Sequence, residues 1–132
     1  MPQEKDITYN NLSFKINSGF EYLEVLIDDI NFSDQKSYIH SVSNLLEFAL
    51  DVNTRYLILN VLNSKFRIKP ELYSFTSKNI LDPLKSNGVK KIICIATEEE
   101  FENHYKKIEL IEPFIKALPS KAEAIKWITE NP

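Results

Sequence analysis

The sequence is poor in glycine, with Gly19 and Gly88 the only two in 132 residues. Loops that cradle phosphate groups need several glycines so that the backbone can approach the anion closely. Neither the Walker fingerprint nor the dinucleotide-binding fingerprint occurs in the chain. The sequence therefore argues against an NTPase of the P-loop type and against a nicotinamide-dependent dehydrogenase, and we predict no cofactor.

Cysteine and histidine are also scarce. Cys94 is the single cysteine, which excludes an intrachain disulfide and fits a reducing compartment. It lies in an apolar run, where burial should raise the pKa of its thiol and make it a poor nucleophile. His40 and His104 are the only histidines and match neither a catalytic triad nor a zinc site. We therefore predict surface positions for both histidines and no metal site.

Long apolar runs and a charge excess of one sign are missing as well. No stretch approaches the ~18 apolar residues of a membrane span, and no apolar signal core follows the charged start Met1–Asp6. The net charge is −3, and lysines alternate with acidic residues along the chain. This balance argues against a nucleic-acid groove or a polybasic membrane patch. We expect a cytoplasmic protein without a membrane span and without a nucleic-acid partner.

The N-terminal part of the chain has the pattern of a β-hairpin. Leu12–Ile16 alternates apolar and polar residues, and Glu21–Ile27 is a second strand candidate. Asn17–Gly19 separates them as a turn in which Gly19 is expected at positive φ. Residues 1–8 are expected to be a flexible tail.

A helix and a parallel βαβ unit follow. The helix is predicted from Ser33 or Asp34 to about Val52, with Phe48 lying off its apolar stripe. Tyr56–Val61 and Lys91–Ala96 are short apolar runs on either side of a helical segment that begins at Pro70. The inward residues of that segment are expected to be Leu72, Tyr73, Thr76, Ile80 and Leu84.

The second half of the chain contains clear helix boundaries. Pro83 predicts a kink or break near Leu81, and Gly88 ends the helical segment as a C-terminal cap. Capping boxes at Thr97 and Ser120 begin two further helices, with a short edge strand at 114–118 between them. The sum predicts a single α/β domain over residues 1–132. Its sheet is mixed but mostly parallel, starts with an antiparallel hairpin and has helices packed on it.

This order of elements resembles the STAS fold of sulfate transporters and anti-sigma-factor antagonists, and in particular the small bacterial SpoIIAA-like STAS/SEC14 proteins. The resemblance is carried by six segments: Tyr56–Asn60, Ile68–Leu72, Asn79-Ile80, Pro83-Leu84, Gly88–Ile92 and Ala124–Ile128. It implies a non-enzymatic regulatory domain that binds a protein partner. Typical members end a strand with Asp and carry a phosphorylated serine at the next helix start. Asn60 and Lys69–Glu71 stand there instead, so the usual phosphoacceptor is absent.

The loop and helix start at residues 62–74 are the predicted partner-binding surface, because α/β folds bind ligands at the carboxyl ends of parallel strands. The candidate residues are Asn63, Ser64, Phe66, Arg67, Lys69 and Tyr73. Phe66 and Tyr73 would be the aromatic anchors, and Arg67 and Lys69 the orienting charges. A solvated loop is the alternative. The partner and the oligomeric state are left open, a homodimer included.

Two other functions stay open. The SEC14-like resemblance implies a carrier with an apolar cavity for a small molecule or lipid, which some of the eight phenylalanines and six tyrosines would line. An enzyme would need Asp28, Asn60 and Thr97 to converge around a pocket at the strand ends. We predict that the protein is not an enzyme, and that these three residues are the first candidates for a pocket.

Overall fold

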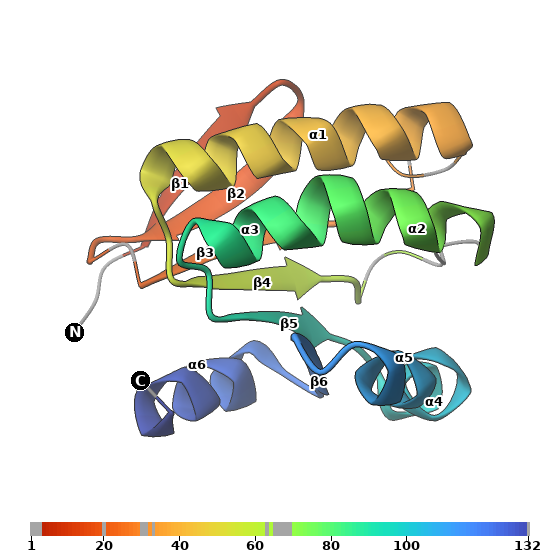
Figure 1. The fold of residues 1–132 in the computed structure, drawn as a ribbon. Helices are drawn as coiled ribbons and strands as arrows, with labels where there is room; N and C mark the ends of the chain where they lie inside the picture. Colours follow the sequence, from red (N-terminus) through yellow and green to blue (C-terminus); the bar gives the residue numbers. More distant parts are fainter. Residues whose placement is uncertain are drawn as a thin grey trace.

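A computed structural model describes residues 4–19, 21–29, 32, 34–62, 64 and 70–131. Six strands form one sheet in the order β1-β2-β3-β4-β5-β6 (Figure 1). They are β1 Glu4–Tyr9, β2 Leu12–Asn17, β3 Tyr22–Leu26, β4 Tyr56–Asn60, β5 Lys91–Ile95 and β6 Ile115–Leu118. The pairs β1·β2 and β2·β3 are antiparallel, and β3 to β6 are parallel. The predicted α/β class with its antiparallel N-terminal hairpin is confirmed.

The helices occupy four stretches of the described chain. They are α1 Gln35–Val52; η1 Pro70–Leu72 continuing through α2 Tyr73–Thr76, η2 Ser77–Leu81 and α3 Asp82–Ser86; α4 Glu98–Glu100 continuing through η3 Phe101–Tyr105 and α5 Lys106–Ile111; and α6 Lys121–Glu130. The predicted caps are confirmed, because Asp34, Thr97 and Ser120 each accept the backbone N–H three residues ahead. None of these helices has the length and apolar content to cross a bilayer.

The strand order decides which face of the sheet each helix covers. Because β3 to β6 follow one another in chain order, right-handed crossovers place all three connecting helical stretches on one face. On this first face, α1, α3 and Tyr105 of η3 share a core with Leu57 and Cys94 of the sheet. The last helix, α6, makes no crossover and packs on the second face, against Ile58 and Ile93 (Figure 1).

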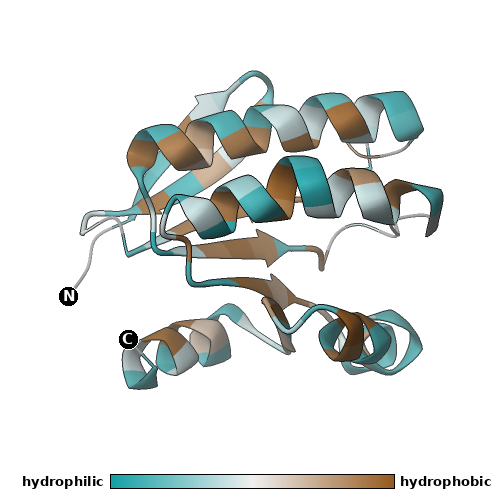
Figure 2. Ribbon diagram, in the orientation of Figure 1, coloured by the Kyte–Doolittle hydropathy of each residue, from teal (hydrophilic) through white to brown (hydrophobic). Residues whose placement is uncertain are grey.

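The residue pattern agrees with this arrangement. Figure 2 shows hydrophobic residues running through β4 and β5, whereas α1 and α3 alternate hydrophobic and hydrophilic residues. Strands covered on both faces need such continuous apolar runs, and helices covered on one side need only a stripe. The central strands and the helices therefore form as their sequences indicate.

The N-terminal segment corrects one expectation. Residues 1–8 were expected to be a flexible tail, but Glu4–Tyr9 form β1 and pair with β2 along the whole strand. Asn10 and Asn11 connect the two strands with φ values of 49° and 69°. A two-residue hairpin of this kind needs positive φ at both positions, which asparagine tolerates better than most residues. The Asn-Asn pair was the signal for an additional hairpin.

The added strand explains why Phe48 lies off the predicted apolar stripe of α1. Its ring centroid lies 5.0 Å from that of Tyr9 and 4.6 Å from that of Phe14. Phe48 is therefore buried against β1 and β2 rather than exposed. The buried face of α1 is therefore wider than the predicted apolar stripe, because the helix lies partly over the hairpin.

The two glycines behave differently. Gly88 follows α3 with a φ of +95°, as predicted for a helix C-terminus. Gly19 does not take positive φ, which corrects the expectation for the β2–β3 turn. That turn is held instead by Asn17, whose Oδ1 accepts the backbone N–H of Gly19 at 2.9 Å. A side-chain turn of this type removes the need for a left-handed residue.

Pro83 does not break the helical stretch from Pro70 to Ser86. The five residues before Asp82 form a π-helical turn, η2, in which the Asp82 N–H donates to the carbonyl of Ser77. The wider turn accommodates a proline, which has no N–H to donate. Leu72, Thr76, Ile80 and Leu84 are buried as predicted, but Tyr73 is 37% exposed and was wrongly placed on the inward face.

We expect Phe48→Ala to lower the free energy of unfolding by about 3 kcal/mol, because it removes a buried ring that packs on two strands. Urea unfolding followed by circular dichroism measures the change. His40→Ala, on the exposed side of the same helix, is the control and should change stability by less than about 0.5 kcal/mol. A loss below about 1 kcal/mol for Phe48→Ala would contradict the packing of α1 on the hairpin.

Candidate functional site

A cavity of about 360 Å³ lies on the first face, between α2–η2 on one side and η3–α5 on the other. Leu59, Cys94 and Ile115 form its floor, one from each of the strands β4, β5 and β6. Tyr38 and Val42 of α1 close it beside α2. The size falls within the range of about 300–1,000 Å³ that is usual for small-molecule pockets.

Most of the wall is apolar, and its polar groups are few. The deepest are the hydroxyls of Tyr38 and Thr76, which are hydrogen-bonded to each other at 2.8 Å and belong to buried residues. Burial raises the pKa of Tyr38, so its phenol stays neutral at physiological pH. Ser74, Ser77, His104 and Glu112 complete the polar part of the lining. An apolar pocket with a few polar groups is the common form of a small-molecule site.

Both π-helical turns of the described chain border this cavity. The first, η2, contributes Ser77 and Leu81 to the lining, and the second, η3, contributes His104 and Tyr105. A π turn adds one residue to a helix and so changes the direction of the side chains around it. Pro83 accounts for the first turn. Such turns occur frequently at functional sites, which makes their pairing across one cavity an argument for a binding role.

The cavity opens where its lining is exposed. Tyr73 and Ile111 line it and are 37% and 72% exposed, respectively. Lys85 of α3 and Glu112 after α5 form an ion pair at 3.1 Å that joins the two sides. His104 is half-buried in the wall, with its ring edge-on to Tyr105. The predicted surface position is therefore confirmed for His40, whereas His104 is only partly exposed.

Cys94 has the properties that the sequence predicts. Its side chain is buried in the cavity floor, and burial is the main reason that its pKa rises to about 12, with the charge of Glu109 adding to the effect. The thiol is neutral at physiological pH and is a poor nucleophile.

The structure describes two of the six predicted partner-binding residues. Ser64 is buried, and its hydroxyl donates to Asp29 Oδ1 at 2.9 Å, so it supports the loop rather than offering a contact surface. Tyr73 is exposed at the cavity opening. The other four candidates, Asn63, Phe66, Arg67 and Lys69, lie outside the described residues.

The three predicted pocket residues, Asp28, Asn60 and Thr97, do not line this cavity. Asn60 points to the second face, where its Nδ2 donates to Glu24 Oε2 at 3.1 Å. Thr97 is occupied as the N-cap of α4. Strand ends do meet at one edge of the sheet, but successive side chains alternate between faces, so Leu59 reaches the cavity and Asn60 does not.

The residues that line the cavity were missed as a set because they come from eight helices and strands and from the segments between them. Two local signals pointed to it. The first is Thr76, a polar residue on the inward face of a helix. The second is the apolar pair Leu110-Ile111, which lies at the end of a helix whose inward face already contains Tyr105 and Ile108. Neither signal indicates on its own where the neighbouring helix lies.

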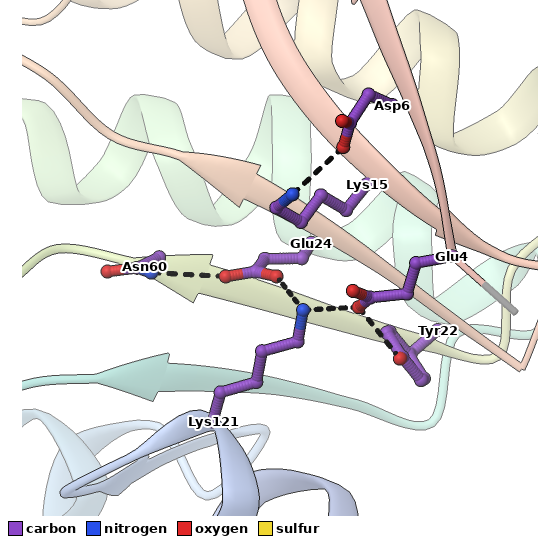
Figure 3. Close-up of polar contacts among 7 residues, drawn as sticks. All are labelled: Glu4, Asp6, Lys15, Tyr22, Glu24, Asn60 and Lys121. Carbon is purple, nitrogen blue, oxygen red and sulfur yellow. Dashed lines mark hydrogen bonds and ion pairs between the residues drawn. The ribbon is translucent and has the colours of Figure 1, made fainter. Parts of the chain in front are cut away.

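The second face carries a charged network that the sequence prediction also missed. Glu24 is only 1% exposed, and its Oε1 lies 2.7 Å from Lys121 Nζ, in an ion pair rather than an aligned hydrogen bond (Figure 3). Lys121 also pairs with Glu4, which accepts a hydrogen bond of 2.9 Å from the Tyr22 hydroxyl. The network joins β1, β3 and the start of α6, so we assign it a structural role.

The pKa values of the network follow from these contacts. Burial lowers the pKa of Lys121, but its contacts with Glu24 and Glu4 outweigh burial and raise it overall. Burial raises the pKa of Glu4, but its contacts with Lys121 and Tyr22 outweigh burial and lower the pKa overall. Both groups are therefore held in their charged forms at neutral pH.

In the part of the chain that the structure describes, no group of three His, Cys, Asp or Glu side chains is placed to hold a metal ion. Comparison of the chain with protein-family models, with curated proteins and with solved structures finds no match. The fold and the cavity therefore define the class: an α/β domain with an apolar cavity of ligand size on one face of its sheet.

We expect Lys121→Met to lower the free energy of unfolding by about 2–3 kcal/mol at pH 7, because it leaves a buried carboxylate without its cation. Urea unfolding measures the change. Lys126→Met, which removes an exposed lysine of the same helix, should change stability by less than about 0.5 kcal/mol. Equal effects of the two substitutions would show that the network does not hold α6.

The network also predicts a pH dependence. Because the pKa of Glu4 is lowered in the folded protein, its stabilisation is present above the ordinary value of 4.5 and is lost as the pH falls through the folded value. The raised pKa of Lys121 adds stability that is present below 10.5 and lost at more alkaline pH. Stability measured from pH 7 to pH 3 should therefore fall more steeply for the wild type than for Lys121→Met. Parallel curves would contradict this coupling.

Proposed function

We propose that the protein binds a small apolar molecule in the cavity between α2–η2 and η3–α5. The observation that carries the proposal is the cavity itself, with about 360 Å³ of space lined mainly by aliphatic and aromatic side chains. An apolar cavity of about 150 Å³ is known to accept one benzene molecule. By the same scale, this cavity has room for a ligand of roughly 12–15 non-hydrogen atoms.

The two buried groups of the lining that could act as nucleophiles, Cys94 and Thr76, favour binding rather than catalysis. Its cysteine is held neutral by burial, and the hydroxyl of Thr76 is hydrogen-bonded to that of Tyr38 instead of to a base. Catalysis by a nucleophile would need such a group beside a base that activates it. The proposal corresponds to the carrier function that the SEC14-like resemblance implies, and it makes the protein a binding domain without an enzymatic reaction.

Naphthalene is a suitable first probe, because its ten carbon atoms fit the estimated size and it has no polar group. We expect saturable binding, measured by titration of amide chemical shifts, with the largest changes at β4, β5 and the helices around the cavity. Leu59→Phe replaces an aliphatic side chain on the cavity floor with a larger aromatic ring. The substitution should weaken naphthalene binding at least about 10-fold, which corresponds to about 1.4 kcal/mol of binding free energy.

Leu46→Phe is the matched control for this substitution. Leu46 is half-buried like Leu59 but lies on α1 outside the cavity lining. It should leave naphthalene binding unchanged, and thermal unfolding should show that both variants are folded. If wild-type protein does not bind naphthalene, or if the two variants lose affinity equally, the cavity is not the binding site.

A second candidate function is protein interaction, which the STAS resemblance implies. It is favoured by Leu110 and Ile111 at the end of α5, which are 81% and 72% exposed. Apolar side chains exposed next to each other are characteristic of interaction surfaces. The first partner to test is a second copy of the chain, because a self-association needs no unknown component.

For this candidate, sedimentation velocity of the wild type should show an average sedimentation coefficient that rises with concentration. Leu110→Ser should abolish the rise, and Lys107→Ser on the same helix should not. Leu110 is chosen because it does not line the cavity, so the substitution leaves ligand binding unaffected. A wild-type protein that stays monomeric up to about 0.5 mM, a concentration at which even millimolar association would show, would exclude self-association through this surface.

A further inference from the structure

We infer that Pro83 positions one wall of the cavity, although it does not itself line the cavity. The inference rests on the proposed binding function and adds a residue that determines the shape of the site. It depends on three observations: the spacing of the buried residues between Pro70 and Ser86, the π-helical turn η2 among them, and the place of the proline directly after this turn.

The buried residues of this helical stretch follow one another at a constant spacing of four. They are Leu72, Thr76, Ile80 and Leu84. A regular α-helix turns by about 100° per residue, so each step of four moves such a row by about 40°, and three steps move it by about 120°. A row that stays on one side of a regular helix needs spacings of three as well as four. The stretch therefore contains one residue more than a regular helix with the same buried face would have.

The turn η2 takes up this additional residue. The Asp82 N–H donates to the carbonyl of Ser77, five residues earlier. A π turn of this kind adds one residue to the helix and so removes about 100° of the rotation. The row next to the buried one has the same spacing, and its members Tyr73, Ser77 and Leu81 all line the cavity. The π turn therefore keeps both rows straight, one in the core and one along the cavity wall.

Pro83 favours the π turn over a regular helix at this place. In a regular helix, its ring would clash with the carbonyl of Asn79, four residues earlier, and it would have no N–H to donate to that carbonyl. Asn79 adds to the turn through its side chain, because its Nδ2 donates to the Phe75 carbonyl at 3.0 Å. Neither Pro83 nor Asn79 lines the cavity. Both act on the site through the backbone that presents the wall residues.

Without the proline, the stretch can form a regular helix that contains one residue too many. The first half of the stretch then turns by about 100° relative to the second half. Leu84 is fully buried and holds the second half in the core. The rotation therefore moves Tyr73 and Ser77 away from Leu81, and the cavity loses the straight wall between them. A large apolar ligand depends on this wall more than a small ligand that rests on the cavity floor.

Pro83→Ala tests the inference with two apolar probes of different size, naphthalene and benzene. We expect the substitution to lower the affinity for naphthalene at least about 5-fold and the affinity for benzene less than about 2-fold. Titrations of amide chemical shifts measure both affinities, and the backbone carbon shifts of residues 77–82 should become those of a regular helix. Pro119→Ala is the matched control, because Pro119 is an exposed proline outside the helices and outside the cavity lining. It should leave both affinities as in the wild type.

Deletion of Lys78 in the Pro83→Ala variant provides a rescue. Lys78 is an exposed residue of η2 that does not line the cavity. Its removal changes the spacing of the buried residues from four, four and four to four, three and four, which a regular helix keeps on one side. We expect the affinity for naphthalene to return to within about 2-fold of the wild-type value. A proline that acted only on stability would change neither the ratio of the two affinities nor respond to this deletion.

The outcomes separate the two proposals. If the wild type binds naphthalene and Pro83→Ala keeps both affinities, or lowers them equally, the binding function stands and the role of Pro83 is wrong. The role is also wrong if the deletion of Lys78 does not restore naphthalene binding. If the wild type binds neither probe, the binding function and the role of Pro83 both fail.

Discussion

The handedness of the βαβ connections is the constraint on which the rest of this structure depends. Consecutive parallel strands lie about 4.8 Å apart, whereas packed helices need about 8–10 Å between their axes. Three helical stretches that must lie on one face therefore cannot each stay above its own pair of strands. Accordingly α1 lies over the hairpin, where Phe48 packs on Tyr9 and Phe14, and η3–α5 lies near the β6 edge (Figure 1). The cavity is the space left between α2–η2 and η3–α5.

The two π turns show how the helices adapt to this space. Each one lies where its helix borders the cavity, and together they direct Ser77, Leu81, His104 and Tyr105 toward it. A regular helix in the same position would be stabilised more easily by its own hydrogen bonds. An irregular turn on both sides of one apolar cavity is consistent with the proposed binding function, because a binding site must stay open while the rest of the core is closely packed.

The two faces of the sheet solve different problems. The first face carries the main core and the cavity, and the second carries α6 and the ion network around Glu24 and Lys121. A buried carboxylate is tolerated there because Lys121 reaches it from the first turn of α6 and Asn60 donates to its other oxygen (Figure 3). Lys121 also pairs with Glu4 of β1. The network therefore makes α6 and the N-terminal hairpin depend on each other. The network lies on the face of the sheet opposite to the cavity.

The sequence by itself determined the elements whose signals are local: the helix caps at Asp34, Thr97 and Ser120, the apolar strands β4 and β5, and the burial of Cys94. It misjudged β1, because the Asn10-Asn11 turn is a weaker signal than glycine, and it placed Asn60 and Thr97 at a pocket because strand ends share an edge. Only the tertiary structure decided the cavity and the Glu24 network. Both are formed by side chains from several elements far apart in the chain, and their meeting depends on crossover handedness, helix spacing and strand register, which no single segment encodes.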